Sequence, residues 1–239
     1  ILDDPAHPYV PNGRTQQATF RISDVNHPNL KPWAAEVMKK DNAEVLAGKI
    51  AYTARSSCKP SGVPDFMAFI VEPIYFIHAP KEVLMIYSGD AQTRHVYMNV
   101  PHSKNPKPSW YGESVGHWEG NTLVVETKNF NGLVGHTSAG VPGSPGPLQP
   151  ETTNQRIVER FTRVAPDTIK FEMRVEDPTV LATGSYTVAY PMYLDNKYEM
   201  YEYACHEGNT AVRNYIETDR KSTRLNSSHV KRSRMPSSA

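Results

Sequence analysis

The sequence predicts a mainly β fold, an antiparallel meander of about nine to ten strands with an N-terminal arm and one helix. From Phe66 onward, apolar residues recur with a period of two, as they do in half-buried strands. The chain has 20 prolines among 239 residues, a fraction above the usual ~5%, which favours turns over long helices. Its 13 tyrosines and many β-branched residues favour sheet.

The meander is expected to close on itself. An open sheet of so many strands would expose its edges, so a lipocalin-like barrel or a two-layer sandwich is predicted. No alternation of strands and helices is visible, which argues against a parallel sheet.

Residues 1–60 are predicted to form an extended arm and one helix, the helix spanning about 31–47. Pro32 suits a first helical turn and Gly48 suits the end of the helix. We expect one face to carry Trp33 and Val37, with Ala34, Met38 and Val45 alongside.

Residues 61–218 are predicted to form the β domain. Residues 168–176 (TIKFEMRVE) alternate most clearly and are expected to pair with 155–164 across a turn at 165–167. Glu119-Gly120-Asn121 is predicted to be a tight hairpin turn. The predicted strands are FMAFIVE (66–72), YFIHA (75–79), VLMIYSG (83–89), RHVYMNV (94–100), SVGHW (114–118), TLVVETKNF (122–130), QRIVERFTRV (155–164), TIKFEMRVE (168–176), YTVAYPM (186–192) and YEMYEYA (198–204).

The connection from 131 to 154 is long and rich in proline and glycine. Connections of that length act as lids or binding loops, or they are plain surface segments, and both interpretations stay open. The two cysteines, Cys58 and Cys205, form one disulfide if the chain is exported, or two buried thiols if they are unlinked.

Residues 219–239 are predicted to be a non-native, disordered tail. The segment DRKSTRLNSSHVKRSRMPSSA has no aromatic residue and no apolar period, and it resembles the translation of a sequencing-library adapter. The whole chain has 26 basic and 25 acidic residues; removing the tail's six basic residues and one acidic residue leaves 20 and 24, a net charge of −4. This balance argues against a nucleic-acid partner. No segment reaches the ~18 to 20 apolar residues of a membrane span.

Three motifs resemble a large group of bacterial proteins of unknown function that are usually predicted to be secreted. They are WYGESVGHWEGNTLVVETKNF (110–130), VERFTRVAPDTIKFEMRVEDP (158–178) and MYEYACHEGN (200–209). The resemblance implies a β-rich fold and export to the periplasm or outside the cell, and it implies no reaction. The chain begins at Ile1 without Met, so a lost signal peptide is compatible with this expectation.

Gly112 to Gly116 matches the G-x-S-x-G pattern of a hydrolase nucleophile elbow. That elbow needs a strand, a sharp turn and a helix, whereas this motif leads into a predicted hairpin. We therefore interpret it as a strand in which the glycines allow a bulge or a close approach.

Acid–base candidates are histidines and one glutamate. No two histidines have the local spacing of a metal site, so no metal ligand is assigned, although distant strands can still bring ligands together. Glu126 lies opposite in phase to Leu123 and Val125, so it faces either a cavity or solvent. A neutral imidazole can act as acid or base near neutral pH. The candidate catalytic residues are His102, His117, Glu126 and His206.

The leading functional hypothesis is an exported barrel that binds a small, partly apolar or aromatic organic molecule, with His/Glu acid–base processing as an extension. One alternative is a metal-dependent enzyme or metal-binding protein that uses converging histidines. Another is a non-catalytic envelope domain that binds a protein. No motif names a cofactor. The candidate ligand-binding residues are Arg94, Tyr87, Tyr97, Trp110, Trp118 and His136.

Overall fold

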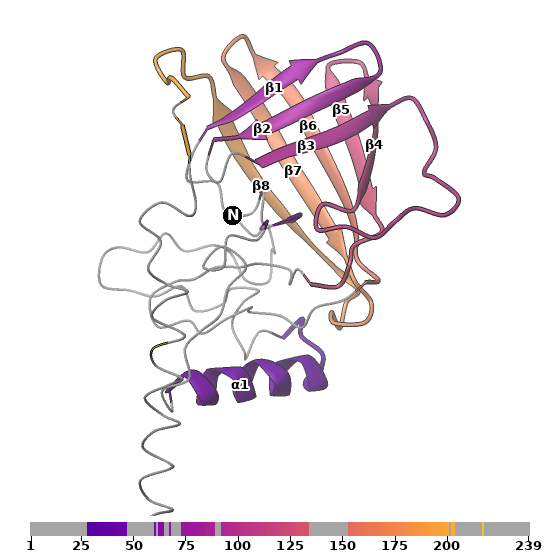
Figure 1. Cartoon of the computed structure of the whole chain (residues 1–239), viewed down its shortest axis with the longest axis vertical. Helices are drawn as coiled ribbons and strands as arrows, with labels where there is room; N and C mark the ends of the chain where they lie inside the picture. Colours follow the sequence, from indigo (N-terminus) through magenta and orange to yellow (C-terminus); the bar gives the residue numbers. More distant parts are fainter. Residues whose placement is uncertain are drawn as a thin grey trace, which may run out of the picture.

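The computed structural model describes residues 28–46, 60, 62–64, 67, 73–88, 92–133, 153–200, 202–203 and 217. Within these residues the chain forms one helix and eight strands (Figure 1). The elements are α1 (Pro32–Leu46), β1 (Ile74–His78), β2 (Glu82–Tyr87), β3 (Gln92–Met98), β4 (Glu113–Glu119), β5 (Thr122–Lys128), β6 (Arg156–Ala165), β7 (Thr168–Glu176) and β8 (Ser185–Tyr193).

The eight strands form one sheet in sequence order, from β1 to β8. Neighbouring strands are antiparallel, as predicted, except at one step: β3 and β4 are parallel, with Val96 opposite Ser114. Parallel neighbours cannot be joined by a tight turn. The chain therefore returns from the end of β3 to the start of β4 through residues 99–112, which we call the crossover.

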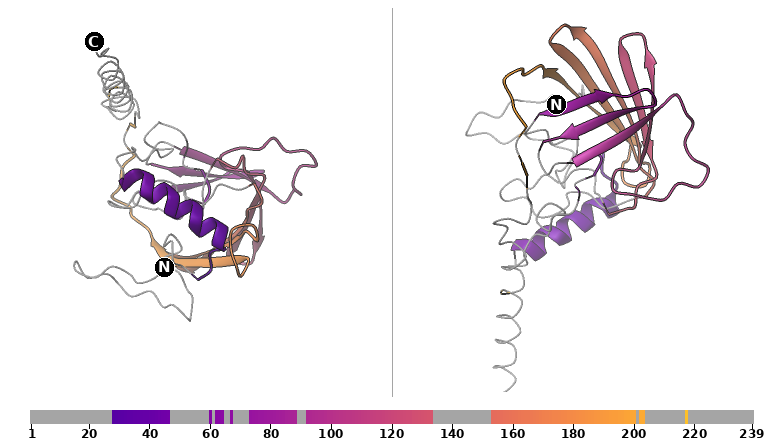
Figure 2. Two further views of the ribbon diagram at one scale, coloured as in Figure 1. Left: turned by 90° about the horizontal axis from the view of Figure 1, so that it is seen from below. Right: turned by 45° about the horizontal axis from the view of Figure 1, so that its top comes forward.

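The sheet curls into a half-barrel (Figure 2). The curl brings Phe76 of β1 against Phe161 of β6, with ring centroids 5.4 Å apart. The prediction of a closed barrel or a two-layer sandwich differs from this arrangement, because β1 and β8 end the described sheet without pairing with each other. The segment after β8 crosses to β1 and β2 instead, where Tyr75 donates a hydrogen bond to the carbonyl of Tyr198 and the Ser88 and Tyr198 hydroxyls are 2.9 Å apart.

Strand alternation determines which side chains form the core. In β7, Phe171, Met173 and Val175 are fully buried on the concave face, while the intervening charged residues face outward. The tight turns between β4 and β5 and between β6 and β7 lie where the sequence predicts them. The core of the half-barrel includes Val83, Met85, Tyr87, Val96, Leu123, Val125, Phe130, Ile157, Phe161, Phe171, Met173 and Val175.

The predicted helix is confirmed as α1, which lies at one end of the sheet (Figure 1). It is tied to the β7–β8 connection because the Lys31 amide donates to the Val180 carbonyl over 2.9 Å. Its buried face carries Ala34 and Met38, whereas Trp33 and Val37 are 44% and 39% exposed. The predicted Trp33 face is therefore the outer one, and Trp33 donates its indole N–H to the Thr179 carbonyl.

Two predicted strands have a different outcome. Residues 66–72 lie outside the described residues except for Met67, which is not in a strand. The described residues of 198–203 form no strand either. The N-terminal arm before residue 28, the loop at 134–152 and the tail after residue 217 lie outside the described residues.

Candidate functional site

The crossover covers part of the convex face of the sheet and creates a hollow there. Asn99, at φ 57°, turns the chain out of β3, and its amide donates to the Gly116 carbonyl over 2.8 Å. Gly116 allows β3 and β4 to pack closely beneath this turn, since a Cβ at that position would lie 2.8 Å from Cγ1 of Val96 in β3.

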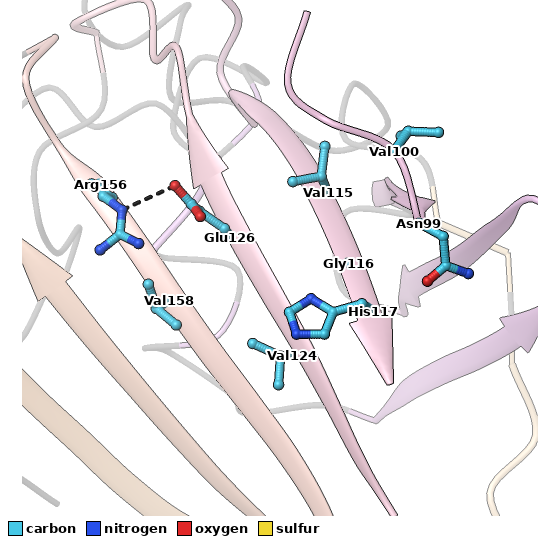
Figure 3. Close-up of a pocket in the computed structure, with 9 residues that line it drawn as sticks. All are labelled: Asn99, Val100, Val115, Gly116, His117, Val124, Glu126, Arg156 and Val158. Atoms are coloured by element: carbon cyan, nitrogen blue, oxygen red, sulfur yellow. Dashed lines mark hydrogen bonds and ion pairs between the residues drawn. The ribbon is translucent and has the colours of Figure 1, made fainter. Parts of the chain in front are cut away.

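The hollow has a volume of about 380 Å³ and combines an apolar surface with one ion pair (Figure 3). This volume lies within the range of small-molecule sites. The strands β4, β5 and β6 supply the floor and the crossover supplies the opposite wall. Its lining residues are Asn99, Val100, Val115, Gly116, His117, Val124, Glu126, Arg156 and Val158.

Glu126 and Arg156 form the polar end of the hollow. Arg156 donates from Nε to Oε1 of Glu126 over 3.0 Å and from Nη1 to Oε2 of Glu176 over 2.7 Å. Lys128 also forms an ion pair with Oε1 of Glu126. The hydrogen bond from Arg156, outweighing partial burial, lowers the pKa of Glu126 to about 2. Glu126 is therefore a carboxylate at neutral pH, and a carboxylate of such low pKa is a weak base.

His102, on the crossover, is held by Glu113 at the start of β4. Its Nδ1 lies 2.9 Å from Oε2 of Glu113, and the Ser103 amide donates to the same oxygen over 3.0 Å. Burial acts to raise the pKa of Glu113, but the hydrogen bonds from Ser103 and His102 outweigh it and the pKa is lowered. An ionised Glu113 accepts from Nδ1–H and so orients the ring, as carboxylates do in carboxylate–histidine pairs.

The other ring nitrogen of His102 has no hydrogen-bond partner among the described residues. Nε2 is buried and lies 3.8 Å from Oε1 of Glu126. Buried polar atoms nearly always have a partner. The structure thus brings together two of the predicted catalytic residues, His102 and Glu126, and leaves one nitrogen between them unused.

His117 lines the same hollow from β4 but is more open. Its side chain is 54% exposed, and Nε2 lies 3.1 Å from Oε1 of Glu119. Glu119 in turn accepts from Arg160. His117 therefore belongs to a solvent-facing charge network at the rim of the hollow.

Arg94 lies on the concave face, inside the half-barrel. Its guanidinium pairs with Glu159 of β6, and both side chains are fully buried. Nε donates to the Ser114 hydroxyl over 3.1 Å and Nη2 to the Thr127 hydroxyl over 2.8 Å. Because these internal acceptors already use the guanidinium, Arg94, a candidate ligand-binding residue, lies within the concave core.

Ser114, the centre of the G-x-S-x-G motif, is also internal. It lies within β4, 2% exposed, with its hydroxyl 2.9 Å from that of Thr127. The interpretation of this motif as a strand is confirmed, since a nucleophile elbow would place the hydroxyl at an exposed turn.

The predicted aromatic binding residues are dispersed. Tyr87 is buried in the concave core. Tyr97 is 47% exposed and lines a second hollow of about 470 Å³ on the other side of the crossover. Trp118 is 48% exposed and stacks on His78 with centroids 5.7 Å apart, while the Trp110 carbonyl accepts from the Val63 amide. None of them lines the convex hollow.

Four predicted residues, His136, His206, Cys58 and Cys205, lie outside the described residues. Within the described part of the chain, no three His, Cys, Asp or Glu side chains are grouped as metal ligands. In the same part, no helix has the length and apolar character to cross a membrane.

Sequence reasoning missed Glu113, Arg156 and Glu159. Glu159 carried a usable signal, because it shares the phase of Ile157 and Phe161 in an otherwise apolar row. Glu113 lies in the G-x-S-x-G pattern, where the serine and not the glutamate was the candidate residue. Arg156 had no distinguishing signal, since it alternates outward like Arg160 and Lys170.

Comparison of the chain with protein-family models, with curated proteins and with solved structures found no match.

Proposed function

We propose that the protein binds a small, partly apolar organic molecule in the convex hollow. The observation that carries this proposal is the combined lining: four valines beside the Glu126–Arg156 pair in about 380 Å³. Ligand sites typically join an apolar surface to a few placed polar groups. The sequence led us to expect the ligand inside the barrel, but the described concave side chains pack against one another as core. Export to the periplasm or outside the cell is part of the proposal and rests on the sequence resemblance.

Filling the hollow tests this function. A Val158→Phe substitution would place a ring in the hollow, and Val164→Phe is the matched control because Val164 is 58% exposed at the end of the same strand. A chemically diverse fragment set would be screened by two-dimensional amide NMR. We expect some fragments to shift the amides of Val100 and Val124 in the parent and in V164F but not in V158F. If no fragment shows this pattern, the proposal is wrong.

Acid–base chemistry on the bound molecule is a second candidate, favoured by the orphan Nε2 of His102. Glu113 orients the ring, so Nε2 is the nitrogen available to take or give a proton. A saturating fragment from the screen should move the Nε2 resonance of His102 in nitrogen-detected imidazole spectra. An unchanged Nε2 resonance in the saturated complex would contradict a catalytic role and leave binding alone.

A further inference from the structure

The Glu126–Arg156 pair has unused hydrogen-bonding capacity. Oε1 of Glu126 accepts from Nε of Arg156 and pairs with Lys128, while Nη1 of Arg156 donates to Glu176. Oε2 of Glu126 and Nη2 of Arg156 have no hydrogen bond to the described residues. Figure 3 shows the second carboxylate oxygen on the side away from Arg156, toward the remaining lining residues. The pair therefore offers one acceptor and one donor at the same end of the hollow.

The charges around this pair cancel. Glu126 and Glu176 pair directly with Arg156, Lys128 and Arg174. A third carboxylate, Glu113, is linked to Glu126 through the His102 ring, so three acids face three bases. A ligand head with a net charge would meet a like charge at close range and would lose its hydration without a free counter-ion. A neutral head that both donates and accepts hydrogen bonds fits this balanced cluster best.

The rest of the hollow selects for a compact apolar group. Val115, Val124 and Val158 project from three adjacent strands, and Val100 of the crossover lines the hollow beside β4 (Figure 3). Branched side chains of this kind pack against methyl groups or a small ring and offer no polar partner.

From these contacts we infer that the ligand class is a small neutral carboxamide with a branched or ring-shaped apolar substituent. Its N–H₂ donates to Oε2 of Glu126, its carbonyl accepts from Nη2 of Arg156, and its substituent packs on the valines. This inference rests on the proposed function, because it names the head group of the molecule bound in the same hollow.

Three probes of similar size test the head group: isobutyramide, which is neutral; isobutyrate, its anionic isostere; and isobutylamine, which is cationic. Each would be titrated into the full chain while the amides of Val100 and Val124 are followed by NMR. Ligands of so few atoms bind weakly, so a dissociation constant of the order of millimolar is expected for isobutyramide. We expect isobutyrate and isobutylamine to bind at least about fivefold more weakly, since each leaves one of the two polar atoms unmatched.

Substitutions in the hollow test whether isobutyramide contacts Glu126 and Arg156. Glu126→Ala and Arg156→Ala should each weaken isobutyramide about tenfold, while V158F should abolish binding and V164F should leave it unchanged. The amide spectrum of each variant verifies that it is folded, as expected for substitutions of partly exposed side chains.

The outcomes separate the two proposals. Equal or tighter binding of isobutyrate or isobutylamine would overturn the carboxamide inference and leave the binding function standing. If none of the three probes binds but screened fragments still cause shifts that V158F abolishes, the carboxamide inference is likewise overturned and the binding function stands. Absence of both probe and fragment binding would overturn the inference together with the proposed function.

Discussion

Arg94 of β3 and Glu159 of β6 form an ion pair inside the half-barrel in which neither side chain is exposed to solvent. The two strands are separated in the sheet by β4 and β5, so the pair spans the concavity. Ser114 and Thr127, from the two intervening strands, accept further hydrogen bonds from the guanidinium. The network therefore joins four consecutive strands at one point.

Removing one member of this pair should be costly. Glu159→Gln leaves a buried guanidinium without its counter-charge, and we expect a loss of about 3–5 kcal/mol in the free energy of unfolding. Urea denaturation followed by circular dichroism measures this loss. The double variant Arg94→Met/Glu159→Leu should recover most of it, because buried pairs are often replaceable by apolar residues. A double variant less stable than E159Q would contradict this account, and Arg160→Gln, in an exposed pair, should cost less than about 1 kcal/mol.

Alanine substitution at two glycines with positive φ, Gly112 and Gly120, should destabilise the protein to different degrees. Gly112 and Gly120 have φ values of 64° and 59°, so alanine costs a similar backbone strain at each, about 1–2 kcal/mol. At Gly112, however, a Cβ would lie 2.4 Å from the Lys128 carbonyl oxygen, whereas at Gly120 nothing lies within 4 Å. We expect G112A to be less stable than G120A by at least about 1 kcal/mol in urea denaturation. Equal losses would mean that the approach of the crossover to β5 is not close.

Acid should weaken the fold through Glu126. Its pKa falls from the ordinary value of 4.5 to about 2 in the folded protein, mainly through the hydrogen bond from Arg156. The stabilisation is therefore complete above pH 4.5 and is lost as the pH falls toward 2. It amounts to at most about 3 kcal/mol, less whatever solvent screening removes. Unfolding free energies measured across this window should decline more steeply in the parent than in Glu126→Gln; parallel curves would show that the carboxylate is not held by Arg156.

Glu113 should control the order of the crossover. Glu113→Gln removes a charged acceptor from the Ser103 amide and from the His102 ring. Hydrogen exchange at the Ser103 amide should become about tenfold faster, the equivalent of one lost hydrogen bond. Glu119→Gln, in the same strand but bonded to His117 and Arg160, is the control and should leave Ser103 unchanged. Similar exchange rates at Ser103 in both variants would contradict the conclusion that Glu113 holds the crossover in place.

The fold was largely predictable because its signals are local. Period-two alternation in β6 and β7 and the Gly120-Asn121 turn determine each hairpin without reference to the rest of the chain. The parallel β3–β4 step was not predictable in this way. The sequence of residues 99–112 indicates only a connection between two strands. Whether β4 runs parallel or antiparallel to β3 depends on where this connection ends. Its end point is fixed by the contacts of Glu113 and Ser109, which form only in the folded protein.

The site was predictable only in part. His102 and Glu126 were recognised as acid–base types, but they come together because the crossover lies over the convex face, a long-range property without a sequence period. The location of Glu126 illustrates the limit. The strand alternation correctly places Glu126 on the opposite face of the sheet from Leu123 and Val125. That face, however, lines the convex hollow under the crossover, and is neither the inside of a barrel nor open solvent.

The parallel step also gives the molecule two unlike rims. Since β4 runs in the same direction as β3, the turns at 79–81, 120–121 and 166–167 all lie at one end of the sheet, where His78 meets Trp118. The crossover returns to the other end, where the 177–184 connection receives the start of α1. Peptide insertions are best tolerated at exposed turns with few contacts. A Cβ at Gly120 would meet nothing within 4 Å, and Gly120 lies at the opposite end of the sheet from the helix anchorage. A reporter peptide inserted there would therefore leave that anchorage undisturbed, which makes the rim of short turns the natural attachment point for labels and surface immobilisation.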